Sequence, residues 1–434
     1  MVNVVTKIVW LVAPVLCSVA PLCAQDIAGD WQGTLRIPNG QLRLIVNLAK
    51  GDDGGWKTMM YSIDQGTEGS AADSTVLHGS SLKFTMNAIH GSYEGTVSAN
   101  GTSIDGTWTQ GRPLPLELKR ATKETAWPRD PAPHTIQFVT VDSDVKLEVL
   151  DFGGSGRPLV LLTGLGNNAH VFDKFAPKLS SSCHVYAITR RGFGASSSPP
   201  PIAANYTADR LGDDVLAVID GLKIDRPVLV GHSIAGEELS SIGSRHPEKV
   251  SGLVYLDAGY GYAFYDRTRG DLRIDAVDLQ SKLEQLLTGS GPRDMRQLVE
   301  ELLHTTLPQF QRDLQERQKQ LVANPPQPGA RKAEPTPALA IMAGQQKYTD
   351  IKGPVLAIYA VPHDRGPAAD KDPVARAAAE ADDLARVGAQ AKAFEAGVPS
   401  AHVVRLPHAN HYVFRSNEAD VLREMNAFFA SLPQ

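Results

Sequence analysis

A serine occupies the junction between an apolar strand-like segment and a helix-like segment. Residues 227–231 are mostly apolar, and a helix-forming stretch follows Ser233 and Gly236. A sharp turn between strand and helix exposes such a serine at the edge of a sheet, and small neighbours let the helix pack against the strand. The fifth position of this motif is usually glycine and is Ala235 here, which adds one methyl group. The spacing predicts that Ser233 is a nucleophile.

A serine hydroxyl is too weakly acidic to attack at neutral pH without a general base. His411 lies in a loop just before the last amphipathic segment of the chain, where we expect this base. His408, three residues earlier in the same loop, is the alternative.

The base in turn needs a carboxylate that orients its ring. Asp364 follows the apolar run 354–359 and is preferred, because a nucleophile, an acid and a base in this chain order are typical of one hydrolase arrangement. Asp257, at the end of the apolar run 252–256, is the alternative acid.

Backbone N–H groups near the serine could stabilise the negative oxygen that forms during acyl transfer. Ile234 lies at the start of the helix, where free N–H groups and the positive end of the helix dipole point towards the reacting carbonyl. Leu165, between Gly164 and Gly166 after another apolar run, offers a second N–H. We therefore expect an oxyanion hole formed by Ile234 and Leu165.

These residues require a sheet whose strand ends meet at one edge. From residue 135 onward, strand-like runs alternate with helical ones, which indicates a mostly parallel sheet covered by helices. The expected strands are residues 136–141, 145–150, 158–163, 184–189, 227–231, 252–256 and 354–359. The core of this α/β domain should comprise residues 135–257 and 353–434.

The alternation stops between residues 258 and 352, where apolar residues recur at helical spacing. Leu279, Leu283, Leu286 and Leu287 form one such stripe. We expect a helical cap inserted into the sheet domain, with its apolar stripes packed in a core rather than against a membrane surface.

Aromatic residues directly follow Asp257. Tyr260, Tyr262 and Phe264 are expected to line a substrate pocket beneath the cap. Their side chains favour an apolar or aromatic substrate group.

The segment before the α/β domain has a different pattern. Residues 25–125 contain short alternating runs separated by glycines, which predicts a small antiparallel all-β domain. Aromatic residues between glycines, such as Trp31, Tyr93 and Trp108, are suited to filling its core. A Pro-rich linker at residues 126–134 separates the two domains.

The first residues resemble a secretory signal peptide. Lys7 precedes an apolar stretch followed by small residues, and we expect cleavage after Ala24. Cleavage would remove Cys17 and Cys23 and leave Cys183 as a lone, buried thiol without an intrachain disulfide. The expected location is therefore the periplasm or the medium.

The charge and composition of the chain indicate which classes of binding partner to expect. The chain has 434 residues, with 43 Lys and Arg against 48 Asp and Glu, and neither sign forms long blocks. A nucleic-acid partner is not expected, whereas a small-molecule substrate is.

These motifs together resemble the α/β-hydrolase superfamily, in the group with a helical cap after the sixth strand. The resemblance covers residues 135–434 and includes the loop Arg190-Arg191-Gly192-Phe193-Gly194-Ala195-Ser196 and the elbow Gly231-His232-Ser233. It implies an α/β-hydrolase fold preceded by the β domain. Dehalogenases and epoxide hydrolases of this superfamily carry an Asp nucleophile, so the resemblance with a serine implies hydrolysis of an ester or a related acyl bond.

Three other interpretations compete with this one. Residues 164–169 also fit a dinucleotide fingerprint, and Arg190 and Arg191 could bind a 2′-phosphate, as in an NADP-dependent oxidoreductase. His408, His411 and Asp364 could bind a metal ion. The chain could also be a non-catalytic ligand-binding protein on a hydrolase fold. The serine hydrolase remains preferred, and we expect no cofactor and no metal.

Overall fold

A computed structural model describes residues 26–37, 40–51, 54–64, 69–129, 133–289, 294–323, 334–364, 366 and 372–433. The expected signal peptide, and part of the expected linker, lie outside these residues. The chain divides into two compact units, of which the first ends at Arg129 and the second contains the described residues from Pro133 onward.

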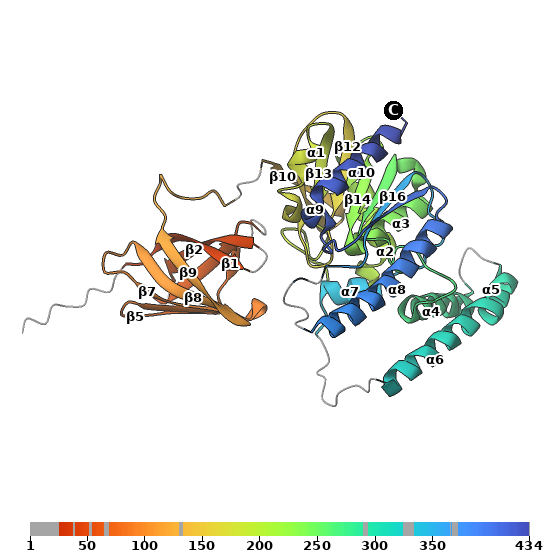
Figure 1. Ribbon diagram of the computed structural model, residues 1–434, viewed down its shortest axis with the longest axis horizontal. Coiled ribbons are helices and arrows are strands. Elements are labelled where there is room, and N and C mark those ends of the chain that lie inside the picture. The colour runs from red at the N-terminus through yellow and green to blue at the C-terminus, as the bar shows by residue number, and fades with distance from the viewer. Residues whose placement is uncertain are drawn as a thin grey trace, which may run out of the picture. The chain divides into compact units, whose positions relative to one another are not determined.

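The first unit is one curved antiparallel sheet of nine strands, a half-barrel (Figure 1). Its strands in spatial order are β4 (Gly69–Ala71), β3 (Trp56–Ser62), β2 (Gly40–Lys50), β1 (Gly29–Ile37), β9 (Arg112–Arg120), β8 (Ser103–Gln110), β7 (Gly91–Val97), β6 (Ser81–Met86) and β5 (Ser74–His78). Trp31, Tyr93 and Trp108 are buried in its core, as the glycine-flanked aromatic pattern predicted.

The second unit is built on an eight-stranded sheet. The spatial order is β10 (Thr135–Asp142), β11 (Val145–Asp151), β13 (Cys183–Ile188), β12 (Arg157–Leu162), β14 (Val228–His232), β15 (Gly252–Leu256), β16 (Val355–Ala360) and β17 (Ala401–Leu406). The six strands from β13 to β17 in this order are parallel, and β11 is antiparallel to both of its neighbours. All seven expected strands are present. Because parallel strands end at one edge, the loops after β14, β15 and β16 open on the same side.

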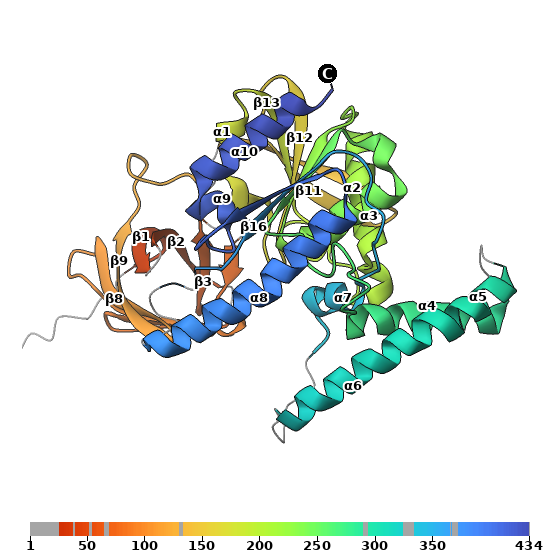
Figure 2. The same ribbon diagram turned by 45° about the vertical axis from the view of Figure 1, so that its right-hand side comes forward.

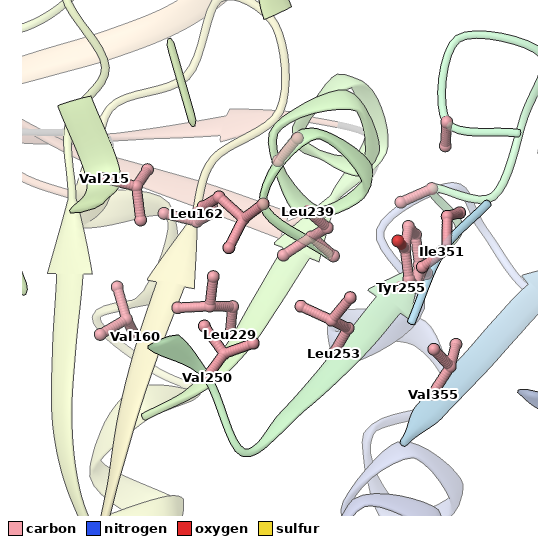
Figure 3. Close-up of a cluster of buried hydrophobic side chains, with 14 of the residues drawn as sticks. Val160, Leu162, Val215, Leu229, Leu239, Val250, Leu253, Tyr255, Ile351 and Val355 are labelled. Carbon is pink, nitrogen blue, oxygen red and sulfur yellow. The ribbon is translucent and has the colours of Figure 1, made fainter. Parts of the chain in front are cut away.

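Helices cover both faces of this sheet. Successive residues such as Leu229 and Val230 belong to different buried clusters, which is the pattern of strands buried on both sides. Figure 3 shows the cluster that contains Leu229. The helices that pack on one face are α2 (Ala208–Gly221), α3 (Gly236–Arg245) and α8 (Pro373–Gly397), and those on the other are α1 (Ala176–Leu179), α9 (Val413–Ser416) and α10 (Glu418–Ser431). Single turns of 3-10 helix are η1 (Asn87–Ile89), η2 (Ala169–Phe172), η3 (Ala203–Asn205), η4 (Ser233–Ala235) and η5 (Pro247–Lys249). Cys183 is buried at the start of β13, and its burial raises the pKa of the thiol.

A helical insertion, residues 258–352, lies between β15 and β16. Its helices are α4 (Leu272–Thr288), α5 (Met295–Glu301), the π-helical turn η6 (Leu302–Thr306), α6 (Leu307–Ala323) and α7 (Pro337–Ala343). Figure 2 shows α4, α5 and α6 grouped together beyond the sheet. The apolar stripe on α4 is only partly packed, because Leu283 and Leu287 are 41% and 84% exposed, so the expectation of a fully buried stripe was wrong. Within the part of the chain that the structure describes, no helix is long and apolar enough to cross a membrane.

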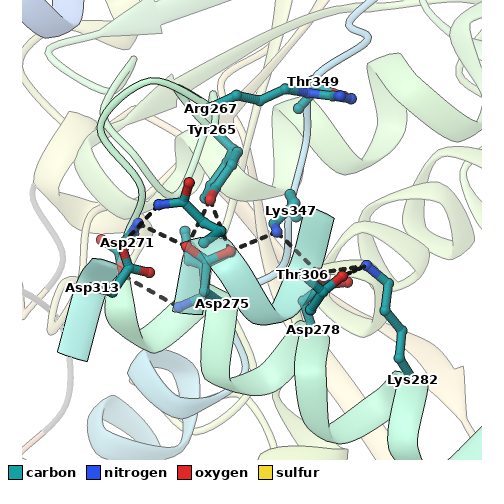
Figure 4. A network of polar contacts seen from close by, with 12 residues as sticks. Tyr265, Arg267, Asp271, Asp275, Asp278, Lys282, Thr306, Asp313, Lys347 and Thr349 are labelled. Carbon is teal, nitrogen blue, oxygen red and sulfur yellow. Dashed lines mark hydrogen bonds and ion pairs between the residues drawn. The ribbon is translucent and has the colours of Figure 1, made fainter. Parts of the chain in front are cut away.

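A buried carboxylate, Asp275, joins segments from both ends of the insertion (Figure 4). The Tyr265 hydroxyl donates to both carboxylate oxygens of Asp275 on α4, at 2.8 and 2.6 Å. Lys347 Nζ lies 2.6 Å from Asp275 Oδ1 and 3.0 Å from Asp278 Oδ2. Because Tyr265 precedes α4 and Lys347 follows α7, the Asp275 carboxylate contacts residues near both ends of the insertion.

Candidate active site

Ser233 lies at the sharp turn between β14 and α3. Its φ of 54° is in the left-handed region, which side-chain-bearing residues rarely adopt, and such strain is typical of functional turns. A Cβ on Gly236 would lie 2.1 Å from the carbonyl oxygen of Ala258, and one on Gly231 would lie 2.9 Å from Leu239 Cδ1. Only glycine fits at these two positions, so the close packing that the motif predicted is present.

His411, in the loop before α9, contacts a carboxylate at the end of β15. Its Nδ1 lies 2.6 Å from Oδ2 of Asp257, which is fully buried. The alternative base, His408, is exposed. The structure thus pairs His411 with Asp257, the alternative acid of the sequence analysis.

Asp364, the preferred acid, is not the partner of His411. It is exposed, and its Oδ1 accepts a hydrogen bond from the N–H of Gly366. Its own N–H donates to the carbonyl oxygen of Ala409, which fixes the backbone of this loop beside the loop of His411. The carboxylate therefore serves a local turn, and the preceding residue, His363, is the one directed at Asp257.

The Asp257 carboxylate accepts four hydrogen bonds. Oδ2 accepts from His411 and, at 2.8 Å, from His363 Nε2, and Oδ1 accepts from the Tyr260 hydroxyl at 2.7 Å and the Ala360 N–H at 3.0 Å. Burial raises the pKa of Asp257, but the hydrogen bonds and charges of the two histidines outweigh it and lower the pKa to about 2. Asp257 is therefore ionised at neutral pH.

His363 has a second carboxylate partner that the sequence analysis missed. Its Nδ1 lies 2.8 Å from Oδ2 of Asp383 on α8, and the same oxygen accepts from the His363 N–H at 2.9 Å. Asp383 lies 20 residues away on a long helix, and nothing in the local sequence marks it. His363 itself could have been considered, because it directly precedes Asp364 at the end of a strand.

The two residues of the expected oxyanion hole follow neighbouring strands, β12 and β14. Ile234 is in the first helical turn, where N–H groups have no acceptor within the helix. The Asn167 N–H donates to Gly164 O at 3.2 Å, so Leu165 begins a tight turn whose next residue, Gly166, has φ of 80°. Leu165 packs against the buried cluster that contains Ile234, and their role in an oxyanion hole stays a prediction.

His232 connects the serine turn to the His411 loop. Its Nε2 lies 3.1 Å from the carbonyl oxygen of His411, and the two rings are 4.7 Å apart. Burial, then the neighbouring His411, lowers the pKa of His232 to about 3. The ring is therefore neutral and donates through Nε2, which holds the His411 backbone beside the residue that precedes Ser233.

A hollow of about 730 Å³ lies between the start of the insertion and α8. Tyr260 and Tyr262 line it. Burial raises the pKa of the Tyr262 hydroxyl, and the nearby Ser233 side chain opposes this rise. Phe264 was expected in this lining but is absent from it; it is buried against Phe394 and would lie 1.9 Å from a Cβ on Gly397. Its side chain belongs to the core and not to the pocket.

The arginines of the dinucleotide interpretation are buried in ion pairs. Arg190 Nε and Nη2 contact Glu238 at 2.5 and 2.8 Å, and Arg191 contacts both oxygens of Asp214. Their guanidinium groups already have carboxylate partners in the core. They are not available to a 2′-phosphate, so this part of the oxidoreductase interpretation was wrong.

The metal interpretation grouped His408, His411 and Asp364, and the structure does not bring these three together. Among the described residues, the donor sets close enough to share an ion are Asp257, His363 and His411, and His134, His170 and Asp173. The first set is already joined by hydrogen bonds, and His170 Nδ1 lies 3.2 Å from Asp173 Oδ2 in the second. We assign no metal to either set.

Comparisons with known proteins agree with this architecture. The chain is 34% identical over 116 residues to a fluoroacetate dehalogenase from Burkholderia sp, covering 26% of this chain and 38% of the relative. It is 34% identical over 106 residues to a 2-hydroxymuconate semialdehyde hydrolase from Pseudomonas sp. strain CF600, covering 24% of this chain and 37% of that protein. The matched region thus spans less than half of each relative.

A solved structure described as a hydrolase from Pseudomonas aeruginosa PA01 aligns with 68% of this chain and 99% of its own, with 19% identity and a TM-score of 0.44. Residues 157–417 match the family described as "alpha/beta hydrolase fold". This match covers more than half of the chain and includes Ser233, Asp257 and His411. The chain belongs to the alpha/beta hydrolase family.

Proposed function

We propose that this protein is an exported serine hydrolase that cleaves a carboxylic ester through Ser233, His411 and Asp257. The observation that carries the proposal is the 2.6 Å contact between His411 and the buried Asp257, in the loop that His232 holds beside the serine turn. An ionised carboxylate on Nδ1 fixes the tautomer in which Nε2 is free to accept the serine proton.

The proposed reaction proceeds through an acyl-enzyme. Ser233 Oγ attacks the ester carbonyl while His411 Nε2 takes its proton, and the carbonyl oxygen becomes an oxyanion facing the N–H groups of Ile234 and Leu165. His411 then returns the proton to the leaving alcohol. Water attacks the acyl-enzyme by the same route and restores the serine. Asp257 stays ionised throughout and stabilises the imidazolium form of His411.

The hollow beside Tyr260 and Tyr262 supports a substrate with an anionic group. Four arginines from three segments line it, namely Arg269 and Arg273 around the start of α4, Arg317 on α6 and Arg386 on α8. The two carboxylates in the lining already have local partners: Asp271 accepts from two N–H groups at the start of α4, and Asp266 accepts from Thr268. Arg386 is paired with Asp383, at 2.9 Å. The other three arginines still outnumber Asp266 and Asp271, so the lining presents excess positive charge, and we propose a carboxylate-bearing ester as the substrate.

Two experiments test the chemistry and the charge preference separately. An organophosphonate should label the protein and fail to label Ser233→Ala, because the substitution removes the attacking oxygen; an unlabelled parent would favour a non-catalytic binding protein. For active enzyme, kcat/KM should be higher for the p-nitrophenyl monoester of adipic acid than for p-nitrophenyl hexanoate, which has the same acyl length without the charge. Arg273→Gln should reduce this ratio, whereas Arg267→Gln, outside the lining, should preserve it.

Export is part of the proposal and rests on residues 1–24. Sequencing the N-terminus of protein recovered from the periplasm or medium should give Gln25 first. Protein that keeps Met1 and stays in the cytoplasm would refute export and leave the hydrolase proposal intact.

A further inference from the structure

The acid of the proposed triad is shared between two histidines. His411 Nδ1 and His363 Nε2 both lie within hydrogen-bond distance of one oxygen, Asp257 Oδ2, at 2.6 and 2.8 Å. The other oxygen is occupied by Tyr260 and the Ala360 N–H. An ionised carboxylate accepts about four hydrogen bonds, so this one is saturated. His363 and His411 therefore share the same oxygen of Asp257 as hydrogen-bond acceptor.

The geometry requires His363 to carry both ring protons. Nε2 faces Asp257 and Nδ1 faces Asp383, and ionised carboxylates only accept hydrogen bonds. A neutral imidazole has one N–H and could satisfy only one of them. Burial lowers the pKa of His363, but the hydrogen bonds and charges of Asp257 and Asp383 outweigh it and raise the pKa to about 9.

We propose that His363, held by Asp383, is a positioning residue that fixes the Asp257 carboxylate and divides its negative charge between two histidines. This inference rests on the proposed function, because it assigns His411 as the base. The hydrogen-bonded side chains Asp383, His363, Asp257 and His411 then link α8 to the loop that contains His411.

Several titratable and charged groups surround the His363 ring. Facing it are Asp257 at the end of β15, Tyr260 with its hydroxyl 3.3 Å from Nε2, Asp383 on α8, and His411 with its ring 6.2 Å away. Asp383 Oδ1 also accepts from Arg386 at 2.9 Å. Asp257 therefore faces one cation, His363, whereas Asp383 faces two, His363 and Arg386.

One consequence for catalysis follows. At high pH, His363 loses its proton as the pH passes about 9, and one of its two carboxylate contacts is lost. The Asp257 carboxylate is then held less firmly, and the arrangement limits activity at alkaline pH.

The test is the pH profile of kcat/KM for p-nitrophenyl butyrate, corrected for spontaneous hydrolysis. In His363→Gln, the alkaline limb near pH 9 should disappear. Asp383→Asn should move the alkaline limb to lower pH, because it removes one of the two carboxylates that hold the His363 proton. Asp364→Asn, which alters an exposed carboxylate in the same loop, should superimpose on the parent. A uniform loss at every pH in His363→Gln, or no change, would overturn the inference.

A second measurement does not depend on turnover. In ¹⁵N-histidine NMR spectra at pH 7, the resonances that disappear in His363→Gln should be those of a doubly protonated ring. A neutral ring at His363 would overturn the inference even if the enzyme is an active serine esterase. Conversely, a doubly protonated His363 in a protein that no organophosphonate labels would mean that the proposed function has failed while the charged bridge between the two carboxylates stands.

Discussion

Nδ1 of His411 lies 2.6 Å from Oδ2 of Asp257, although 154 residues separate them in the chain. Asp257 ends β15 and the adjacent strand β16 leads to Asp364, so the two candidate acids follow neighbouring strands. Only Asp257 is buried and aimed at the imidazole. The carboxylate that orients the His411 ring therefore follows β15 and not β16.

Exchanging each carboxylate for an amide should separate the candidates. Asp257→Asn should lower kcat by roughly 10⁴, by analogy with the acid of the serine-protease triad, because the amide no longer stabilises the required tautomer and the imidazolium. Asp364→Asn should keep activity close to the parent's. Steady-state kinetics on a p-nitrophenyl ester checks both variants, and a crippled Asp364→Asn with an active Asp257→Asn would return the acid to the loop after β16.

Much of the α/β domain could be predicted because its strands are apolar runs buried on both faces. β17 was not predicted, since His402 and Arg405 on this edge strand are exposed and interrupt the apolar pattern. The first unit was predicted as a small antiparallel all-β domain from short alternating runs separated by glycines. Burial of its glycine-flanked aromatic residues could be predicted from the local sequence alone.

The site was predicted less completely, because the direction of each side chain decides which of the candidate residues contact one another. Asp257 and Asp364 follow neighbouring strands. Chain order favours Asp364, but the structure leaves Asp364 exposed. Phe264 is as aromatic as Tyr262, but packing against Phe394 turns it into the core. The pairing of Asp383 with His363 depends on how α8 crosses the sheet, which no local pattern specifies.

The tight contact between α3 and the loop after β15 predicts a marked cost for Gly236→Ala. The new Cβ would lie 2.1 Å from the backbone oxygen of Ala258, so α3 or the loop must move. We expect destabilisation of about 1–3 kcal/mol, typical of overpacking, and reduced activity because the serine turn shifts with the helix.

Gly388→Ala is the matched control. Gly388 lies inside α8, and its Cβ would meet only Leu384 Cδ1 at 4.0 Å. Alanine should stabilise this helix by about 0.5–1 kcal/mol. Equal unfolding midpoints in urea for the two variants would contradict the packing argument at Gly236.

Lys347 should matter more to stability than an exposed lysine nearby. Lys347→Met would leave Asp275, which is 1% exposed, without its cation. We expect a loss of about 1–3 kcal/mol, as for a hydrogen bond to a buried charge. Lys352→Met removes an ion pair whose partners are more than half exposed and should cost less than about 1 kcal/mol. Thermal unfolding that ranks the two variants in the opposite order would refute this role for Lys347.

The two units should be separable by deletion. The buried cluster of the half-barrel contains only residues 27–118, and the clusters around the eight-stranded sheet contain only residues after 138. A chain that starts at Asp130 should therefore fold and keep its esterase activity. An insoluble product would contradict independence, and intact turnover with an altered substrate range would assign the half-barrel a role in binding.

The raised pKa of His363 predicts how stability depends on alkaline pH. A histidine has a pKa of about 6.5 in an unfolded chain, against about 9 for His363 in the folded protein. Because the folded state binds this proton more tightly, the stabilisation is fully present below about pH 6.5 and is lost as the pH rises through about 9.

Comparing the parent with His363→Gln isolates this contribution. His170 also has a pKa raised to about 9, after burial is offset by its hydrogen bonds with Asp173 and Glu148, but its effect is common to both proteins and cancels in their difference. The difference in unfolding free energy, measured in urea at a series of pH values, should be constant near pH 6 and shrink steadily between about pH 6.5 and 9. A difference that stays constant across this interval would show that His363 does not hold its extra proton in the folded state.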